Sequence, residues 1–344
     1  MSDESIFLRA LRKENLPIPP IWYMRQAGRY MPEYRAVRKN FKNFLDMCKN
    51  PEVCCELALQ PINAFKLDAA ILFSDILTIP DAFGLGVQFV ENEGPVFQNP
   101  IEKVDDIKNL MPFDPENLTY VYEAVTNIKN ALPSNIPLIG FCGSPWTLAA
   151  YSIEGRSSKD FKKTITFIKE NTDESHLFLS KLTDACFLYL RKQVQAGADV
   201  IQIFDSWANI LDTEDLKSFS FNYIKLLINA LKNDSVTSNI PIILFARDPK
   251  CSPGTLIDTS ADCLSLYWSM NDFDIEFARN KTALQGNLNP KILLESKDVI
   301  KTETHKLLEK FKDFPGYVFN LGHGLTPDIC PEKVKYLTEL VREC

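Results

Sequence analysis

Short apolar segments recur along the whole chain, and each one ends in polar residues or glycine. They are PIWYM (20–24), AAILFSD (69–75), PLIGFCG (137–143), DVIQIFD (199–205), PIILFA (241–246), CLSLYW (263–268), TALQGNL (282–288) and YVFNLGH (317–323). Continuous apolarity, without alternation of polar and apolar residues, is typical of strands that are buried on both faces. The segments between them have helical spacing. The sequence therefore predicts parallel β-strands joined by helices.

Eight such strands alternating with helices predict an α/β fold, a single (β/α)8 TIM barrel over residues 1–344, with the N-terminal ~18 residues peripheral. The alternative is an open doubly wound sheet, which usually has about five or six strands. Residues 86–100 predict a small hairpin inserted after the second strand. Helices are expected at 52–66, at 159–196 (two helices, ending before Gly197), at 212–232, at 290–312 and at 331–343.

Composition narrows the class of ligand. The 344 residues carry a formal net charge of -7, which argues against a general binder of nucleic acid or of an anionic membrane. The N-terminus has acids at Asp3 and Glu4 and no long apolar core, so we expect neither a secretory signal nor a transit peptide, and a cytoplasmic protein. Nine cysteines without a CxxC pair are typical of reduced, cytosolic thiols.

The sequence lacks the familiar cofactor motifs. It contains no GxxxxGKS or GxxxxGKT loop, no GxGxxG and no GxSxG. His176, His305 and His323 lie far apart, whereas zinc needs several Cys or His ligands at close spacing. We therefore expect a site that needs neither a metal nor a cofactor.

A barrel places its functional side chains on one rim, just after the strand ends. All but one of the expected strands are followed there by polar residues, which predicts a ligand site at that end of the barrel. These residues are Arg25 and Gln26, Asp75, Ser144, Ser206, Arg247, Asn287 and His323.

The first of these strands leads into the most basic stretch of an otherwise acidic chain. Between Trp22 and Lys42 there are six basic residues and one acidic residue, Glu33. Arg25 and Arg29 are four residues apart, and Gly28 permits a tight turn. Because the planar arginine fork binds carboxylates two bonds at a time, the stretch predicts an anion site. The alternative is a solvated basic helix face.

Three other residues are candidates for chemistry. Asp75 ends the run ILFSD; nearby arginines would keep it ionised and burial would oppose this, and the alternative role is to cap a following helix. Tyr151 follows a glycine-rich loop on a helix, where core packing is the alternative. His323 stands between two glycines, which favours a ring that faces a ligand.

Two blocks of sequence, PIWYMRQAGRYMPEYR and GFCGSPWTLAAYSIEG, resemble the signature regions of the uroporphyrinogen decarboxylase family. ILFSDIL, QIFDSW, LQGNLNP and YVFNLGHGLTP resemble further blocks of that family in the same order, from about residue 20 to the C-terminus. The resemblance implies a homodimeric (β/α)8 barrel without a cofactor. It also implies removal of the four acetate carboxyl groups of uroporphyrinogen III as CO2, which gives coproporphyrinogen III in haem biosynthesis.

The resemblance further implies roles for individual residues. Arg25 and Arg29 would bind substrate carboxylates, Asp75 would accept the pyrrole N–H groups, and the backbone from Arg25 to Arg29 would line the site. The implied catalytic residues are Asp75, Arg25, Tyr151 and His323. The implied substrate-binding residues are Arg25, Gln26, Ala27, Gly28, Arg29, Arg38, Asp75, Tyr151, Ser206 and His323.

The chemistry explains these residue types. A pyrrole acetate cannot simply lose CO2, because the resulting carbanion has nowhere to delocalise. Protonation of the adjacent ring carbon makes a cationic ring that accepts the electrons, so the substrate supplies its own electron sink. An ionised Asp75 would stabilise this cation. Arg25, with an ordinary pKa above about 12, is a poor acid and is interpreted first as a carboxylate clamp.

Some positions depart from the family pattern. Arg156, Ser157 and Asn209 stand at or near places where the family often has glycine, and residues 246–263 diverge, so Arg247 is left unassigned. Two alternatives remain. A related barrel methyltransferase acting on a corrinoid or a thiol would bind zinc through a His-x-Cys pair, which this chain lacks. A non-catalytic tetrapyrrole-binding protein would not need Asp75 beside the arginines.

Overall fold

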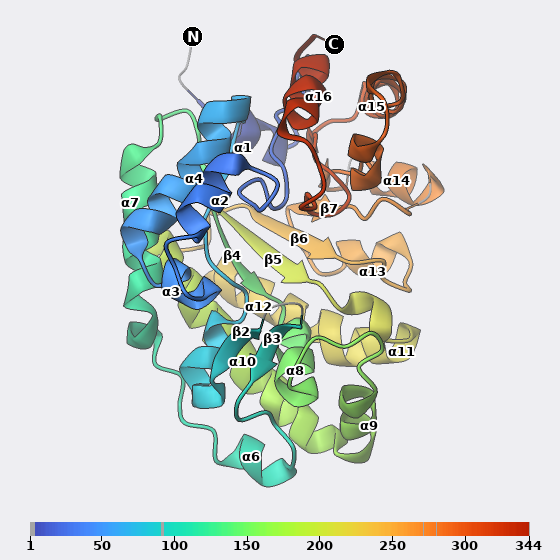
Figure 1. Ribbon diagram of the computed structural model, residues 1–344. Helices are drawn as coiled ribbons and strands as arrows, with labels where there is room; N and C mark the ends of the chain where they lie inside the picture. The colour runs from blue at the N-terminus through green and yellow to red at the C-terminus, as the bar shows by residue number, and fades with distance from the viewer. Residues whose placement is uncertain (1–3, 91–92, 271, 280, 344) are drawn as a thin grey trace.

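The computed structural model describes residues 4–90, 93–270, 272–279 and 281–343. Its centre is a curled parallel sheet of seven strands in the order β1-β4-β5-β6-β7-β8-β9 (Figure 1). The strands are β1 (Ala70–Ile71), β4 (Leu138–Gly143), β5 (Val200–Asp205), β6 (Ile242–Ala246), β7 (Cys263–Ser265), β8 (Ala283–Gln285) and β9 (Tyr317–Val318). Each lies within one of the expected apolar segments, and the expected α/β barrel-type fold is confirmed.

The eighth expected strand, at 20–24, is an extended segment with one β-bridge, between Ile21 and Phe319. It lies between the two edge strands of the sheet. The backbone N–H of Phe319 donates to the carbonyl of Pro20 over 2.9 Å, and that of Asp68 donates to the carbonyl of Ile21 over 2.8 Å. Residues 20–24 therefore connect β9 to β1 and complete the wall of the barrel.

Helices lie on the outside of this wall (Figure 1). The expected helices are present as α4 (Pro51–Phe65), α9 (Lys162–Glu170), α10 (Thr172–Gln195), α11 (Thr213–Asp215), the π-helix η4 (Leu216–Phe221), α12 (Asn222–Asn233), the 3-10 helix η5 (Pro290–Leu294), α15 (Lys297–Phe311) and α16 (Pro331–Glu343). Prolines begin α4 and α16, because the missing N–H of proline costs no hydrogen bond in a first turn.

Other elements were not expected from the sequence. The longest is α7 (Thr119–Ala131), whose buried Val121, Val125 and Ile128 follow a helical period. The remaining helices of this kind are α1 (Ile6–Leu11), α2 (Pro32–Arg38), α3 (Phe44–Cys48), α5 (Thr78–Pro80), η1 (Asp81–Leu85), α6 (Val104–Lys108), η2 (Pro115–Leu118), η3 (Ala208–Ile210), α13 (Pro253–Ile257) and α14 (Asp272–Ala278). In contrast, α8 (Pro145–Glu154) is the helix expected to carry Tyr151 after the glycine-rich loop. None of the described helices combines the length and the apolarity needed to cross a membrane.

The helix α1 differs from the peripheral position expected for the N-terminal residues. Phe7, Ala10 and Leu11 are buried and pack in one apolar cluster with Trp22 and Val318. This cluster also contains residues from the inner face of the strands, so α1 covers the end of the barrel where the strands begin. The opposite end is left for a ligand.

The expected hairpin is confirmed as β2 (Val87–Val90) and β3 (Gly94–Phe97), paired from Val87 and Phe97 to Val90 and Gly94. It is attached to the segment that follows α8, because Val96 forms an antiparallel bridge with Arg156. Arg156 and Ser157, two departures from the family pattern, thus belong to the segment that holds the hairpin.

Candidate active site

The carboxyl ends of the parallel strands meet at one end of the barrel, marked in Figure 1 by the arrowheads of β5 and β6. Arg25, Asp75, Ser206, Arg247 and His323 follow strand ends there, as the sequence predicted. Tyr151 joins them from α8. These side chains surround the opening of the barrel at the strand ends.

The backbone of Arg25 adopts a left-handed conformation, with φ of 62°, directly after Met24. The turn was expected to depend on Gly28, but Gly28 has an ordinary φ, and the strained residue is the arginine itself. The N–H of Met24 donates to Asn320 Oδ1 over 3.1 Å, and its carbonyl accepts from the N–H of Leu325 over 2.9 Å. The last strand segment therefore fixes the point from which Arg25 enters the site.

The Arg25 side chain crosses Gly324. A Cβ atom added to Gly324 would lie 2.7 Å from Arg25 Cγ, closer than two carbon atoms can approach. The side chain is accessible to solvent, yet the surrounding protein lowers the pKa of Arg25 through desolvation, and the charges of Arg247 and Arg29 lower it further. Tyr151 and Asp75 act in the opposite direction.

Asp75 is half-buried, and its pKa is raised to about 6, chiefly because the surrounding protein desolvates the carboxylate. The N–H of Leu77, which donates to Asp75 Oδ1 over 2.8 Å, and the charge of Arg25 both lower this pKa. Asp75 does not cap α5, because the N-cap position of that helix is Leu77 and has no side-chain cap. The second carboxylate oxygen of Asp75 therefore does not bond to a helix. With a pKa of about 6, the carboxylate of Asp75 is mostly ionised at neutral pH.

His323 lies among aromatic rings, with its centroid 5.9 Å from that of Phe245 and 6.1 Å from that of Trp268. Its two flanking glycines are required by close contacts. A Cβ atom at residue 322 would lie 2.8 Å from the Cα of Trp268, and residue 324 faces Arg25. Burial lowers the pKa of His323 to about 3, and Arg25 and Arg247 lower it too, so the imidazole is neutral at neutral pH.

Tyr151 is held by aromatic contacts on α8. Its ring meets those of Trp207 and Phe161 edge-on, with centroids 5.7 and 5.9 Å away. Burial raises the pKa of Tyr151, Asp75 raises it too, and Trp207, Ser157 and Arg25 lower it. The side chain is half-buried and close to Arg25 and Asp75, so it faces the site as well as packing in the core.

The fully buried carboxylate of Asp205 joins three elements below the site. It accepts hydrogen bonds from Ser144 Oγ at 2.8 Å, Thr147 Oγ1 at 3.0 Å and Ser220 Oγ at 2.6 Å. Burial raises the pKa of Asp205, and these hydroxyls lower it. Asp205 thereby fixes the start of α8, and Ser144, expected at the rim, is buried as the N-cap of that helix.

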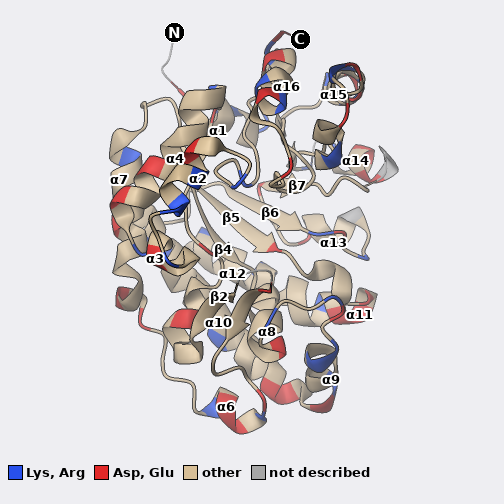
Figure 2. Ribbon diagram, viewed as in Figure 1, with Lys and Arg blue, Asp and Glu red and all other residues tan. Residues whose placement is uncertain are grey.

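The remaining predicted residues lie around the basic stretch. Gln26 is buried and donates to the carbonyl of Ala69 over 3.2 Å, so its side chain supports the wall. Arg29 is exposed and Ala27 and Gly28 are half-buried, whereas Arg38 donates to the carbonyl of Phe41 over 2.6 Å. Arg35 of α2, where Figure 2 shows basic residues, donates to the carbonyls of Arg29 and Tyr30.

Sequence reasoning left Arg247 unassigned, but the structure places it in the site. Its guanidinium carbon lies 5.3 Å from the ring centroid of Trp207. It lowers the pKa of Arg25, His323 and Tyr267, the last through a hydrogen bond as well as its charge. Its position directly after the expected strand at 241–246 had placed it on the rim, without indicating a role.

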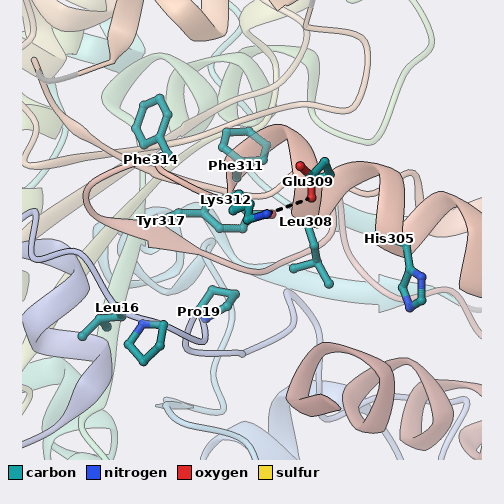
Figure 3. A pocket seen from close by; sticks show the side chains of 10 residues that line it. Leu16, Pro19, His305, Leu308, Glu309, Phe311, Lys312, Phe314 and Tyr317 are labelled. Carbon is teal, nitrogen blue, oxygen red and sulfur yellow. Dashed lines mark ion pairs between the residues drawn. The ribbon is translucent and has the colours of Figure 1, made fainter. Parts of the chain in front are cut away.

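A cavity of about 370 Å3 lies elsewhere, at the end where the strands begin. Figure 3 shows its lining by residues 16–19, the C-terminal part of α15 and the start of β9. No predicted site residue lines it. Among the described residues, no group of three or more His, Cys, Asp or Glu side chains could hold a metal ion.

The fold and these contacts define a class: an α/β barrel with an arginine-rich ligand site at the carboxyl ends of its strands. The family model described as Uroporphyrinogen decarboxylase (URO-D) matches residues 2–344. The chain is 46% identical over 346 residues to the uroporphyrinogen decarboxylase of Legionella pneumophila (strain Paris), covering 99% of this chain and 97% of the relative. The corresponding protein of Hydrogenovibrio crunogenus is 46% identical over 341 residues, covering 97% and 96%. The chain belongs to the uroporphyrinogen decarboxylase family.

Solved structures with low sequence identity share the fold. A methyltransferase from Methanosarcina mazei superposes with a TM-score of 0.79 at 20% identity, covering 99% of both chains. A B12-independent methionine synthase from Shewanella sp. W3-18-1 gives a TM-score of 0.53 at 12% identity, covering 85% of this chain and 87% of the other. At these identities the likeness concerns the fold alone.

Proposed function

We propose that the site binds uroporphyrinogen III with Arg25 and Arg29 on its carboxylates and Asp75 against its pyrrole N–H groups. The reaction is that of the family: the chain is a carboxy-lyase of haem biosynthesis that removes acetate carboxyl groups as CO2. The observation that carries the assignment of Asp75 is a half-buried, mostly ionised carboxylate beside Arg25 at the strand ends.

The substrate changes charge during the reaction, and the site contains groups for both charges. A proton adds to the ring carbon next to the acetate-bearing carbon and makes the pyrrole cationic. The bond between the acetate methylene and its carboxylate then breaks, CO2 leaves, and the electron pair neutralises the ring. A proton adds to the methylene to form a methyl group, and the ring carbon loses its extra proton. Asp75 stabilises the cationic states.

Neutral groups complete the contacts with the carboxylate arms. Because the pKa of His323 is about 3, its imidazole offers one N–H donor without adding positive charge. The raised pKa of Tyr151 keeps its hydroxyl protonated as a donor. Ser206, which follows Asp205 at the end of β5, is a third donor on the same rim. We therefore assign His323, Tyr151 and Ser206 to hydrogen bonding with the substrate carboxylates.

We assign Arg25 to carboxylate binding first. The surrounding protein lowers its pKa, which makes it a less poor acid than a free arginine. A bound substrate carboxylate would raise the pKa again, because opposite charges favour each other's ionised forms. Arg38 donates one N–H to the carbonyl of Phe41 and is the weaker carboxylate ligand of this group.

Two further features of the family, a homodimer and a cytoplasmic location, are proposed here on the resemblance. The same holds for the single-domain organisation and for the absence of a cofactor.

The experiment that tests the function is direct. Purified protein is incubated anaerobically with uroporphyrinogen III and nothing else, and the carboxyl groups of the product are counted by chromatography. We expect stepwise loss of four carboxyl groups. Unchanged substrate, or activity that depends on added zinc or a corrinoid, would refute the proposal.

A further inference from the structure

Arg247 is fixed to the strand wall. It follows β6 directly, and its backbone N–H donates to the carbonyl of Asp205 over 3.0 Å. The next residue, Asp248, has a φ of 42° and turns the chain away, and its carboxylate accepts a hydrogen bond from Ser269 Oγ over 2.6 Å. The carboxylate adjacent to Arg247 in the sequence is therefore bonded elsewhere.

The arginines of the chain fall into groups by partner. Five form ion pairs with carboxylates: Arg9, Arg12, Arg191, Arg279 and Arg342. Arg35 and Arg38 donate to backbone carbonyls. Within the described ranges, Arg25, Arg29, Arg156 and Arg247 have neither kind of partner. Two of these, Arg25 and Arg29, are already proposed as carboxylate ligands, and Arg247, like them, has no carboxylate partner among the described residues.

Arg247 also faces the same space from the other side. In the closed order of the wall, β6 lies four places from the 20–24 segment in either direction, so Arg247 and Arg25 enter from opposite sides of the barrel. Each charge nonetheless reaches the centre, since Arg247 affects the pKa of both Arg25 and His323. A ligand between the two arginines would meet positive charge on both sides.

The Arg247 side chain is preorganised. Its guanidinium lies 5.3 Å from the Trp207 ring, a cation–π distance, and it contacts the Tyr267 hydroxyl. Tyr267 is in turn packed on Trp268, with ring centroids 3.8 Å apart. An arginine held by aromatic rings keeps N–H donors free for a carboxylate and loses little entropy when it binds one.

We propose that Arg247 binds a carboxylate arm of the tetrapyrrole on the wall opposite Arg25, with Tyr267 as its positioning residue. The inference rests on the proposed function for the identity of the ligand. The inference also extends the proposed function. A polycarboxylate ring held on one side only would be free to tilt over Asp75. Contacts on both walls would instead fix the position of the acetate that reacts.

Arg247→Met, which keeps an unbranched apolar stem and removes the charged head, is the central variant. Losing a charge-assisted hydrogen bond should raise KM for uroporphyrinogen III about 10- to 100-fold, while kcat stays within about threefold. The increase of KM with added salt should become shallower than in the unaltered enzyme. Arg247→Lys should give an intermediate KM and keep most of the salt dependence.

Lys250→Met is the matched control. It removes the same charge from the same loop, but Lys250 is exposed and acts on the pKa of Asp212, away from the site. Its KM should stay within about twofold of the unaltered enzyme. Tyr267→Phe, which removes only the hydroxyl, should raise KM about threefold to tenfold with kcat preserved.

Binding of uroporphyrinogen III to Asp75→Asn, measured by anaerobic equilibrium dialysis with and without Arg247→Met, separates this inference from the proposed function. If the unaltered enzyme removes carboxyl groups but Arg247→Met changes neither KM nor this binding, Arg247 is not a ligand and only the inference fails. A loss of kcat at unchanged KM would also overturn it. Should Arg247→Met fold poorly, as judged by thermal melting, Arg247→Gln serves as the uncharged variant under the same criteria.

Discussion

Asp75→Asn should inactivate the enzyme and stabilise its fold. The substitution keeps the shape of the side chain and the oxygen that accepts from the N–H of Leu77, but removes the negative charge. A unit charge about 4 Å from the cationic pyrrole, at an effective dielectric constant near 20, contributes roughly 4 kcal/mol. We therefore expect kcat to fall by a factor on the order of 1,000 while substrate binding is retained.

The same substitution should lower turnover but raise the free energy of unfolding. Burial raises the pKa of Asp75 from 3.8 to about 6, so the folded protein favours the protonated carboxyl. The stability that this group contributes is present below pH 3.8 and is lost as the pH rises through about 6. The difference corresponds to at most about 3 kcal/mol at neutral pH. Asparagine stays uncharged, so Asp75→Asn should unfold at higher urea concentration at pH 7, with a smaller gain at pH 4.

The assays are anaerobic turnover with product separation, urea unfolding at both pH values, and the pH dependence of kcat/KM. In the unaltered enzyme kcat/KM should decline below about pH 6 as Asp75 becomes protonated, and this decline should vanish in Asp75→Asn. Turnover within tenfold of the unaltered enzyme would remove Asp75 from the mechanism. A variant less stable at pH 7 than the unaltered protein would show that burial does not dominate its pKa.

Three other substitutions test the architecture around the site. Gly324→Ala should displace the Arg25 side chain and raise KM at least about tenfold, whereas Gly254→Ala, at a glycine with only ordinary contacts, should leave KM unchanged; equal effects would contradict the packing argument. Asp205→Ala leaves three buried hydroxyls without an acceptor and should cost at least about 3 kcal/mol in urea unfolding; a loss below about 1 kcal/mol would disprove this role. Gln202→Leu should stabilise the protein by about 1–2 kcal/mol, because both polar atoms of the buried Gln202 amide lack a partner among the described residues; destabilisation would show that the amide is satisfied.

Much of the fold could be predicted because strands buried on both faces leave a strong apolar pattern. All eight expected segments lie in the barrel wall, but the pattern could not show that the 20–24 segment pairs through a single bridge. The helix α7 has an apolar period as clear as that of the predicted helices, so the sequence does contain the signal for it. The burial of α1 depends on Trp22 and Val318, which are distant in sequence, and no local signal indicates it.

The site, like the fold, has features that the sequence predicts and features that it does not. Arg25, Asp75, Tyr151 and His323 could be named from strand ends, glycines and motifs, and the structure places them around one space. The strained backbone of Arg25 was missed because glycine is the usual residue at positive φ, and Gly28 was the nearest candidate. Arg247 was predicted at the rim from its position after a strand, but it was given no role because its segment diverges from the family pattern.

The contact between Arg25 and Gly324 joins residues from opposite ends of the chain. The first arginine of the site is made early in synthesis, but its supporting residues, from Phe319 to Leu325, are made much later. A chain released before β9 would contain most of the proposed ligands and yet lack the edge that holds Arg25 in place. Competence to bind the substrate should therefore appear only after residues 319–325 have been made and have closed the wall, which makes ligand binding a sensitive reporter of the closed barrel.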